Sequence, residues 1–291
     1  MKISIAMATY NGEKFVYEQL ESFINQTRQP DEVIITDDGS NDQTVSLINS
    51  FSEIAPFDVK VFCNKKRLGY SQNFNLALSQ TTGDIVFLSD QDDVWFPKKI
   101  SKIVKLFEKE PDTLLIMNDA ALTDKELKET GYTKIGQIQR SGASMDKFVM
   151  GCCCAFRREL LTLCLPVPTE FNSHDKWLVG IATSLNKKYI YHRVLQYYRR
   201  HDENTSKHYF NKATKMSCVH AFLYKASLWI NGEMVHKLEE RHQQQIAFLE
   251  GINRVLEEAP ITYHPHLQRL HKLTTHRIHR LSKILAIFNR K

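Results

Sequence analysis

Apolar and polar positions alternate regularly along the first part of the chain. Short apolar runs rich in Ile, Val and Phe have the character of buried strands, and the longer blocks between them repeat apolar residues at helical spacing. Strands are predicted at residues 3–8, 32–35, 59–62 and 85–88, and helices at residues 13–26, 43–51, 70–79 and 98–108. Because strand and helix alternate, the pattern predicts an α/β fold in which helices cover a parallel sheet.

Polar loops follow three of the predicted strands. Residues 9–12 (Thr-Tyr-Asn-Gly) come after the first strand, residues 37–42 (Asp-Asp-Gly-Ser-Asn-Asp) after the second, and residues 90–93 (Asp-Gln-Asp-Asp) after the fourth. In open α/β sheets, ligands bind beyond the carboxyl ends of the strands. We therefore expect the three loops to converge on one crevice.

The loop after the fourth strand has the most specific chemistry. Asp90, Asp92 and Asp93 directly follow an apolar run. Carboxylates are rarely buried without a partner, and their oxygens suit hard cations such as Mg²⁺ or Mn²⁺. The loop is therefore a candidate metal or phosphate site, and the alternative is a surface turn whose aspartates cap a helix.

Several stretches then follow in a distinctive order. They are residues 8–12 (Ala-Thr-Tyr-Asn-Gly), 36–40 (Thr-Asp-Asp-Gly-Ser), 69–75 (Gly-Tyr-Ser-Gln-Asn-Phe-Asn), 83–84 (Gly-Asp) and 89–93 (Ser-Asp-Gln-Asp-Asp). Together they resemble the nucleotide-sugar half of a family 2 inverting glycosyltransferase, in its bacterial polysaccharide or rhamnosyltransferase-like branch, and the likeness continues more weakly to His201. The resemblance implies a GT-A fold, a sugar-nucleotide donor, and Mn²⁺ or Mg²⁺ as the cofactor.

The resemblance also implies a set of donor-binding residues. Asp38, with Asp37 as the neighbouring candidate, would accept a hydrogen bond from the ring imide of uracil or thymine. Tyr10 would offer a face for stacking on the base. The nucleotide-sugar set comprises Thr9, Tyr10, Asn11, Asp37, Asp38, Asn73 and Asp90 from the first half of the chain.

Local turn chemistry supplies alternatives for several of these residues. Asp37 and Asp38 are also the residues of an Asx turn, which would close the loop on its own backbone. Asn11, with the glycine that follows, is also typical of the turn that ends a strand. Asp42 is placed outside the site because it precedes a predicted helix, which it is expected to cap.

Within the acidic loop the resemblance assigns unequal roles. Asp92 matches the final aspartate of the family's Asp-x-Asp motif and would bind the metal, and Asp90 would hold the ribose or a water of the metal. A bound cation disperses the negative charge of a nucleoside diphosphate leaving group. Asp93 is expected to cap the helix that starts near Phe96, and Trp95 is interpreted as a core or shelf residue.

An inverting transfer also needs a base that takes the proton from the acceptor hydroxyl. Asp175, within residues 173–178 (Ser-His-Asp-Lys-Trp-Leu), resembles the family's acidic motif at the start of a helix, which implies that it is this base. Ser173 is expected to cap the helix, and His174 departs from the acidic residue that often precedes the base. The alternative for Asp175 is a carboxylate that only stabilises the positive end of the helix.

Residues 194–204 resemble the strand and loop that close the site in the rhamnosyltransferase-like branch. Arg199 and Arg200 would bind the diphosphate, and His201 would be a metal or phosphate ligand. Neighbouring strand residues point to opposite faces, so only one arginine need face the site. The alternative for His201 is a solvated loop histidine.

The stretch between the two halves is the least regular. Residues 119–146 are polar and are expected to form a mobile acceptor-side lid. Residues 148–157 return to an apolar pattern that contains three adjacent cysteines, which lack metal-ligand spacing and are expected to be small buried strand residues. The six cysteines of the chain do not compose a disulfide framework.

Length and composition fit one large core with an appendage. We expect a catalytic domain at residues 1–205, divided into a nucleotide-sugar half at 1–118 and an acceptor half at 119–205, and a helical region at 206–291. Residues 209–258 are interpreted as helices that include Trp229 and Phe248. No signal peptide is expected, and no apolar run approaches the roughly 18 residues of a membrane span, so the protein is expected in the cytoplasm.

The positive charge is concentrated in the tail. The formal net charge is +6, yet seven Lys and Arg and no acid lie from Ala259 onward, which leaves the remainder near −1. Apolar residues recur there at helical spacing, so a basic amphipathic helix could bind the anionic inner face of the plasma membrane. The alternative is a terminal helix that packs on the catalytic domain. Nucleic acid is not expected, because aromatic and basic residues are not interleaved.

The sequence therefore predicts a metal-dependent inverting glycosyltransferase that adds a single sugar from a UDP- or dTDP-linked donor. Rhamnose is the favoured sugar, and the expected acceptor is a lipid-linked oligosaccharide of a capsule or O-antigen. One alternative is a haloacid-dehalogenase-type phosphatase with Asp90 as nucleophile and Asp92 as acid, although its later motifs are not found in order. A second is a non-catalytic sugar-nucleotide or carbohydrate-binding module. Neither Gly-x-Gly-x-x-Gly nor Gly-Lys-Ser/Thr is present.

Overall fold

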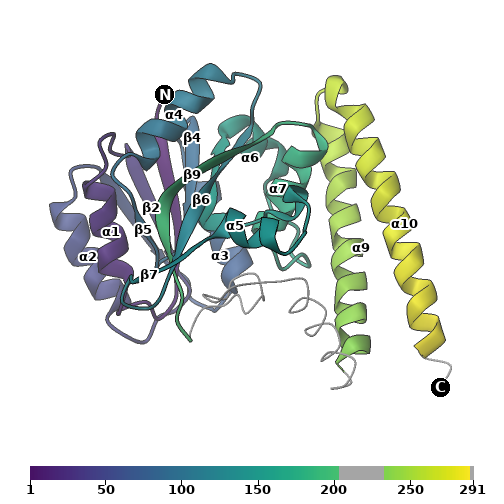
Figure 1. The fold of residues 1–291 in the computed structure, drawn as a ribbon, viewed down its shortest axis with the longest axis horizontal. Helices are drawn as coiled ribbons and strands as arrows, with labels where there is room; N and C mark the ends of the chain where they lie inside the picture. The colour runs from purple at the N-terminus through teal and green to yellow at the C-terminus, as the bar shows by residue number, and fades with distance from the viewer. Residues whose placement is uncertain (203–232, 289–291) are drawn as a thin grey trace.

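A twisted sheet with helices on both faces forms the body of the protein, and two long helices stand at one side of it (Figure 1). The computed structural model describes residues 1–202 and 233–288. This arrangement confirms the predicted α/β class, with a helical part at the C-terminal end.

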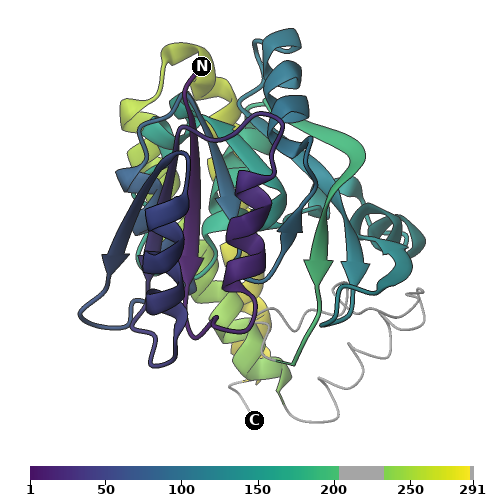
Figure 2. The ribbon, with the colours of Figure 1, turned by 90° about the vertical axis from the view of Figure 1, so that its left-hand side faces the viewer.

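The first half of the body is a parallel sheet whose elements match the predicted pattern. The strands are β1 (Ile3–Thr9), β2 (Glu32–Asp37), β3 (Asp58–Cys63) and β4 (Ile85–Ser89), and the helices are α1 (Val16–Ile24), α2 (Thr44–Ile54), α3 (Tyr70–Gln80) and α4 (Lys99–Lys109). Strand β1 pairs in parallel with both β2 and β4, and β2 pairs in parallel with β3. The carboxyl ends of these strands therefore lie at one edge of the sheet (Figure 2).

The second half continues the same sheet with mixed directions. Its strands are β5 (Val94–Trp95), β6 (Leu115–Thr123), β7 (Glu129–Thr133), β8 (Cys154–Arg157) and β9 (Lys188–Arg199). Its helices are α5 (Lys134–Arg140), α6 (Arg158–Cys164) and α7 (His174–Ser184), with short 3₁₀ turns η1 (Met145–Lys147) and η2 (Gly151–Cys153). The sheet order is β3-β2-β1-β4-β8-β6-β9-β5, and β7 pairs with β6.

The prediction of a mobile lid at residues 119–146 is wrong. Strand β6 is buried throughout, β7 pairs with it in an antiparallel ladder, and α5 follows directly. The polar composition suggested an exposed loop, but polar side chains in this segment are buried and have hydrogen-bond partners. Asp119, for example, accepts the amide hydrogens of Ala120 and Ile135 at 2.9 Å each.

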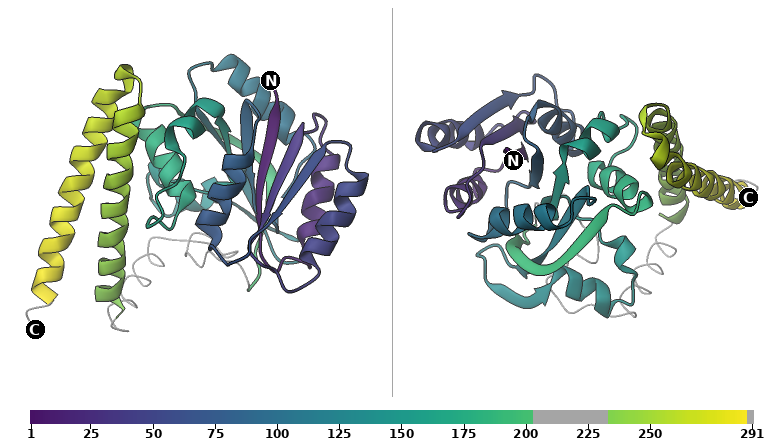
Figure 3. Two further views of the ribbon diagram at one scale, coloured as in Figure 1. Left: turned by 180° about the vertical axis from the view of Figure 1, so that it is seen from behind. Right: turned by 90° about the horizontal axis from the view of Figure 1, so that it is seen from above.

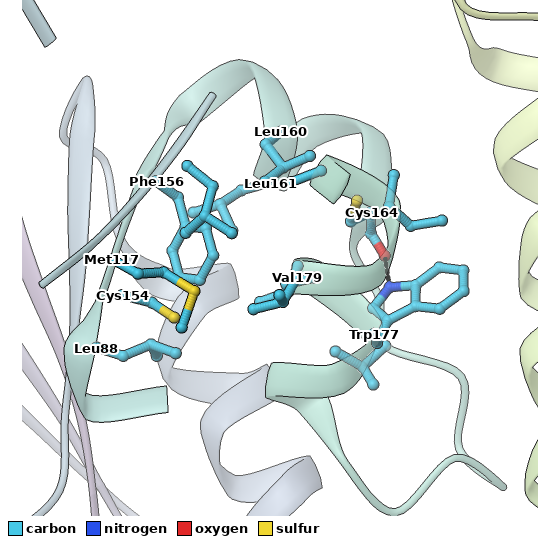
Figure 4. Packing of buried hydrophobic residues seen from close by; sticks show 14 of the residues in the cluster. Leu88, Met117, Cys154, Phe156, Leu160, Leu161, Cys164, Trp177 and Val179 are labelled. Atoms are coloured by element: carbon cyan, nitrogen blue, oxygen red, sulfur yellow. Dashed lines mark hydrogen bonds between the residues drawn. The ribbon is translucent and has the colours of Figure 1, made fainter. Parts of the chain in front are cut away.

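Two apolar cores lie on the two faces of the sheet, because successive strand residues point in opposite directions. Ile85 and Phe87 of β4 pack with α1, α2 and α4, whereas Val86 and Leu88 pack with α3, α6 and α7. Figure 4 shows the second core, in which the Trp177 indole N–H donates to the carbonyl of Cys164 at 2.8 Å. The first turn of α7 is thereby fixed to the end of α6.

The cysteines are partly as predicted. Cys152, Cys153 and Cys154 are buried and free, but only Cys154 lies in a strand, since the first two form η2. Cys63 is exposed and Cys164 is buried, and both are free. Cys218 lies outside the described residues.

Two long helices form the C-terminal part, as the sequence predicts. Helix α9 (Met234–Glu258) and helix α10 (His264–Phe288), joined by η4 (Ile261–Tyr263), run side by side (Figure 3). The Phe248 ring of α9 packs at 5.3 Å from that of Trp177, and His242 of α9 is 2.8 Å from the Ser282 hydroxyl of α10. Of the segment interpreted as helical at 209–258, residues 209–232, with Trp229, lie outside the described residues. Among the helices that the structure describes, none is long and apolar enough to cross a membrane.

Candidate active site

Three polar loops meet at the carboxyl edge of the parallel sheet, as predicted. The amide of Asp38, after β2, donates to the carbonyl of Thr9 at 2.9 Å. The Gln91 side chain, after β4, accepts from the amide of Tyr10 at 2.9 Å and donates to its carbonyl at 3.0 Å. Gln91 also explains why residue 12 is a glycine, since the Cβ atom of any other residue would lie 2.4 Å from the Gln91 Oε1 atom. The site is therefore built from three loops held in fixed register.

Asp37 closes the β2 loop on itself. Its carboxylate accepts the amide hydrogens of Gly39 at 3.1 Å and Ser40 at 2.8 Å, as in the Asx-turn alternative. It also accepts the Thr9 hydroxyl at 2.8 Å, which joins the ends of β1 and β2. Asp37 and Thr9 are both buried, so they shape the loop.

Asp38 instead holds the neighbouring loop before α3. Its carboxylate accepts from the Asn64 amide group at 3.0 Å and from the backbone amides of Leu68 at 2.7 Å and Gly69 at 2.9 Å. Gly69 has a φ of +79°, a conformation that glycine adopts without strain. Asn73 completes the link, because its side chain accepts from Asn64 at 2.9 Å and donates to the carbonyl of Thr36 at 2.8 Å.

The remaining donor-side residues lie around the β1 turn. The Arg67 guanidinium covers one face of the Tyr10 ring at 3.9 Å from its centroid. Asn11 adopts a φ of +46° and accepts the amide hydrogen of Asn41 at 2.9 Å, which fits its turn alternative. Asp42 accepts the amide hydrogen of Thr44 at 3.0 Å, but it lies one residue before Gln43, the N-cap residue of α2, which makes no side-chain cap.

Asp90 and Asp92 follow the end of β4 and differ in their surroundings. Burial, the neighbouring Asp92 and then Asp175 raise the pKa of Asp90 to about 7. The Asp92 carboxylate lies 2.8 Å from the His201 Nε2 atom, and both side chains are almost buried. Carboxylates that repel one another beside an imidazole form a donor set that Mg²⁺ or Mn²⁺ fits.

Asp93 does not cap a helix, so that expectation is wrong. Helix α4 begins after Lys98 without a side-chain cap. Asp93 is instead fully buried and accepts the Gln196 side-chain amide at 2.8 Å. Burial and the nearby carboxylates raise its pKa well above the usual value. The strand pairing between β5 and β9 turns Asp93 inward, toward β9.

Among the described residues, the one close grouping of three possible metal ligands differs from the set of Asp90, Asp92 and His201 and shares only Asp90 with it. The ligand atoms of Asp90, Asp93 and Cys152 all lie within 4.8 Å of one another. Burial raises the pKa of the Cys152 thiol well above its usual value, so the sulfur stays protonated, and it is a soft ligand in any case. Because a hard cation prefers oxygen, we favour Asp90 with Asp92 and His201, an assignment that stays a prediction.

Asp175 lies in the first turn of α7 and faces the same edge. Its carboxylate accepts the Ser173 hydroxyl at 2.8 Å, so Ser173 occupies the N-cap position without making the predicted side-chain cap. A Cβ on Gly151 would lie 3.7 Å from the Cβ of Asp175. His174 is buried and stacks on Phe74 at 4.2 Å, and burial lowers its pKa.

The two arginines have different surroundings. The Arg199 side chain is 3% exposed and donates to the carbonyls of Asp92 at 2.9 Å and Lys125 at 2.6 Å. It also pairs with Glu18. Arg200 donates to the Tyr198 hydroxyl at 3.3 Å. The neighbouring side chains thus diverge, as expected for a strand, and Arg199 binds protein groups.

A buried lysine behind the acidic loop has no counterpart among the predicted residues. The Lys99 ammonium donates to the carbonyl of Cys152 at 2.9 Å and to the Gln196 side chain at 2.5 Å, and burial lowers its pKa. It also lies 3.8 Å from the centre of the Trp95 ring, which is a core residue as interpreted. A lysine in an amphipathic helix normally indicates a solvated face, so the sequence offered no signal for this one.

Comparisons with known proteins agree with this geometry. An uncharacterised glycosyltransferase of Nostoc sp. is 28% identical over 215 residues, which cover 70% of this chain and 66% of that protein. The dTDP-rhamnosyl transferase RfbG of Shigella flexneri is 25% identical over 68% of this chain and 72% of its own length. The chain spans only 33% of an uncharacterised glycosyltransferase of Haemophilus influenzae.

Solved glycosyltransferases share the fold. Residues 1–349 of TarS from S. aureus in complex with UDP-GlcNAc match with a TM-score of 0.60 and 20% identity, over 88% of this chain and 82% of that one. The mannosyltransferase PcManGT from Pyrobaculum calidifontis, in complex with GDP-Man and Mn²⁺, matches with a TM-score of 0.54 and 18% identity, over 98% and 74%. The likeness confirms the predicted GT-A fold.

The family model described as "Glycosyl transferase family 2" matches residues 4–163. This range includes β1 to β4, the acidic loop and η2, and it leaves the phosphatase alternative without support. Since the match covers more than half of the 291 residues, the chain belongs to glycosyl transferase family 2.

Proposed function

We propose that the protein is a metal-dependent inverting glycosyltransferase. It transfers one sugar from a UDP- or dTDP-linked donor, with rhamnose favoured, to a hydroxyl of a lipid-linked oligosaccharide in surface polysaccharide synthesis. The observation that carries the proposal is that Asp90 and Asp92 follow the end of β4 and that burial, then Asp92 and Asp175, raise the pKa of Asp90 to about 7. The similarity to a dTDP-rhamnosyl transferase supports the choice of donor.

Asp175 acts as the base in this proposal. It takes the proton of the acceptor hydroxyl while that oxygen attacks the anomeric carbon, and the bond from this carbon to the phosphate oxygen breaks with inversion. Asp90, Asp92 and His201 would hold a divalent cation, which disperses the charge of the nucleoside diphosphate leaving group. Ser173 orients the base, because its hydroxyl donates to the Asp175 carboxylate at 2.8 Å.

The base of the donor is proposed to lie over the β1 and β2 loops. A carboxylate has about four acceptor positions, and that of Asp38 receives three hydrogen bonds from Asn64, Leu68 and Gly69. One position therefore remains for a ring imide once Arg67, which lies 4.0 Å from the Asp38 carboxylate, moves away. Arg67 would leave the face of Tyr10 when a base stacks there, which costs little because the side chain is largely exposed. We assign catalysis to residues 1–205 and a supporting role to residues 206–291.

The exposed face of α10 is proposed to contact the anionic inner face of the plasma membrane. Arg269, Lys272 and Lys283 are exposed on this helix, together with Leu273 at 48% and Ile287 at 67%. Basic residues with interspersed apolar ones suit an anionic lipid surface. Co-sedimentation should be stronger with phosphatidylglycerol vesicles than with phosphatidylcholine vesicles and should fall in the double variant Lys272→Glu/Lys283→Glu. Equal binding to both vesicles would contradict the contact.

Hydrolysis of a nucleotide-sugar panel tests the function. The panel contains UDP- and dTDP-linked sugars, including dTDP-rhamnose, each assayed with Mn²⁺ and with chelator. The proposal predicts release of the nucleoside diphosphate from one donor class, lost on chelation. Binding of a donor without turnover, even with an oligosaccharide acceptor, would favour the non-catalytic binding module instead.

A further inference from the structure

The segment that ends β9 is tied to the start of α1 by one buried arginine. Arg199 donates to the backbone carbonyl of Asp92 at 2.9 Å and to that of Lys125 at 2.6 Å, and it pairs with Glu18 of α1. These three partners come from the acidic loop, the β6–β7 turn and α1. Arg199 therefore fixes the backbone of the acidic loop against the N-terminal helix.

Phe15 lies between this arginine and His201. The Arg199 guanidinium lies 4.6 Å from the centre of the Phe15 ring, and the His201 ring centre is also 4.6 Å from it, with the rings tilted by 38°. Such cation–π and aromatic contacts hold side chains in preferred orientations. The Phe15 ring thus touches both the arginine that holds the Asp92 backbone and the imidazole that contacts the Asp92 carboxylate.

The orientation of the imidazole matters because it is aimed at one oxygen. The His201 Nε2 atom is 2.8 Å from the Asp92 Oδ2 atom, and the His201 side chain is 10% exposed. Strands β5 and β9 pair antiparallel, with Val94 opposite Tyr197, so the segments that carry Asp92 and His201 leave the sheet at the same end. The strand pairing places the two backbones, and the Phe15 ring lies against the imidazole.

We propose that Phe15 and Arg199 are positioning residues that hold His201 in ligating orientation beside Asp92. The inference deepens the proposed function, since it rests on Asp92 and His201 as metal ligands. Partners outside the ligand set that orient the ligands typically change metal affinity strongly when they are lost. Phe15 also follows the β1 loop within a few residues, so the segment that leads from the proposed base site into α1 also carries the residue that orients the metal ligand.

Mn²⁺ binding to the full chain, measured by calorimetry without nucleotide, tests the inference. Phe15→Leu keeps an apolar side chain and loses the aromatic face, so its Mn²⁺ dissociation constant should rise by about tenfold. Phe15→Tyr keeps the face and should stay within about twofold of the wild type. Tyr17→Leu is the matched control, because Tyr17 is an aromatic residue in the first turn of α1, two residues after Phe15, and is 41% exposed. This variant should bind as the wild type does.

A second variant guards against loss of folding in Phe15→Leu. Glu18→Gln removes the charge that pairs with Arg199, and the Glu18 side chain is half exposed, so the fold should tolerate the change. This variant should also weaken Mn²⁺ binding. Glu21→Gln, at an exposed position of the same helix, is the control and should bind as the wild type does. Wild-type affinity in both Phe15→Leu and Glu18→Gln would overturn the inference and leave the proposed function intact. Wild-type protein that binds Mn²⁺ but turns over no donor would overturn the proposed function alone, and no Mn²⁺ binding by the wild type would overturn both.

Discussion

Two groups of aspartates occupy the same edge of the sheet and are built in opposite ways. After β2, the Asp37 and Asp38 carboxylates accept hydrogen bonds from backbone amides and neighbouring side chains. After β4, Asp90 lies near Asp92 and Asp175, and burial together with this repulsion raises its pKa to about 7. The β2 carboxylates are held by hydrogen-bond donors. At Asp90, burial and repulsion outweigh the opposing effect of the Lys99 ammonium, and Asp92 lies against His201.

The difference separates framework from chemistry. Hydrogen bonds to a carboxylate stabilise the loops that they join, so the β2 aspartates contribute to folding. Carboxylates forced together cost folding free energy and are typical of sites that act on charged ligands. Changes in the first group should therefore lower stability, and changes in the second should lower activity while sparing or raising stability.

Asp175→Asn should give the largest effect. Without a proton acceptor near the attacking hydroxyl, the transfer rate should fall by about 10³-fold, while donor binding is retained. Single-turnover transfer and calorimetric donor titration measure the two properties. The matched control is Glu159→Gln, an acidic residue in the first turn of α6, which should leave both unchanged. Transfer that survives in Asp175→Asn would refute the base assignment.

Asp38→Asn should destabilise the framework. The variant places an amide group where the carboxylate accepts from Leu68 and Gly69, so one backbone amide loses its partner and unfolding becomes easier by about 2–3 kcal/mol. Urea denaturation measures the change. Asp58→Asn, at an exposed position that starts β3, should stay near the wild type. Equal stability of both variants would place Asp38 with the chemical group instead.

Asp90→Asn should act in the opposite direction on stability. An amide carries no charge, so both the cost of burying a carboxylate and the repulsion from Asp92 and Asp175 disappear. The metal-free protein should gain about 2 kcal/mol, or about 4–8 °C in melting temperature. The exposed Asp112→Asn should not change the melting temperature. A lower melting temperature for Asp90→Asn would mean that its carboxylate is satisfied within the fold.

The pH dependence of stability should show the same contrast on a smaller scale. The pKa of Asp90 is raised from 3.8 to about 7 in the folded protein, so between these values the folded state binds more protons than the unfolded state. The metal-free melting temperature should carry a component that falls as the pH rises from 5 to 7. His174, whose pKa is lowered by burial, contributes with the opposite sign. The difference between wild type and Asp90→Asn in the slope of melting temperature against pH therefore isolates the contribution of Asp90. Identical slopes would contradict the raised pKa of Asp90.

The parallel half of the fold could be predicted closely from the sequence, and the reason is physical. Strands β1, β2 and β4 are buried on both faces, so they appear as nearly continuous apolar runs that end at polar loops. Because parallel strands end at the same edge of the sheet, the loops that meet at the site could be predicted from these runs. The second half, with its mixed strand directions, carries no such signal, because polar residues such as Asp119 are buried in β6 with hydrogen-bond partners such as the amide of Ile135.

Within the site, the sequence indicated which residues lie near one another, but it did not indicate their hydrogen-bond partners. Asp93 and Arg199 lie next to candidate ligands, yet Asp93 faces Gln196 and Arg199 binds Asp92, Lys125 and Glu18. These partners are about a hundred residues distant or more in most cases, so no local pattern predicts them. The roles of the site residues stay predictions that the variants above test.

Nucleotide affinity with and without metal tests the central claim most directly. UDP and dTDP are titrated into the wild type and Asp92→Asn by calorimetry, with Mn²⁺ and with chelator. The account predicts that Mn²⁺ tightens binding of one of them to the wild type by about tenfold or more and that Asp92→Asn loses this gain. Equal affinity with Mn²⁺ and with chelator, or a full Mn²⁺ effect in Asp92→Asn, would contradict it.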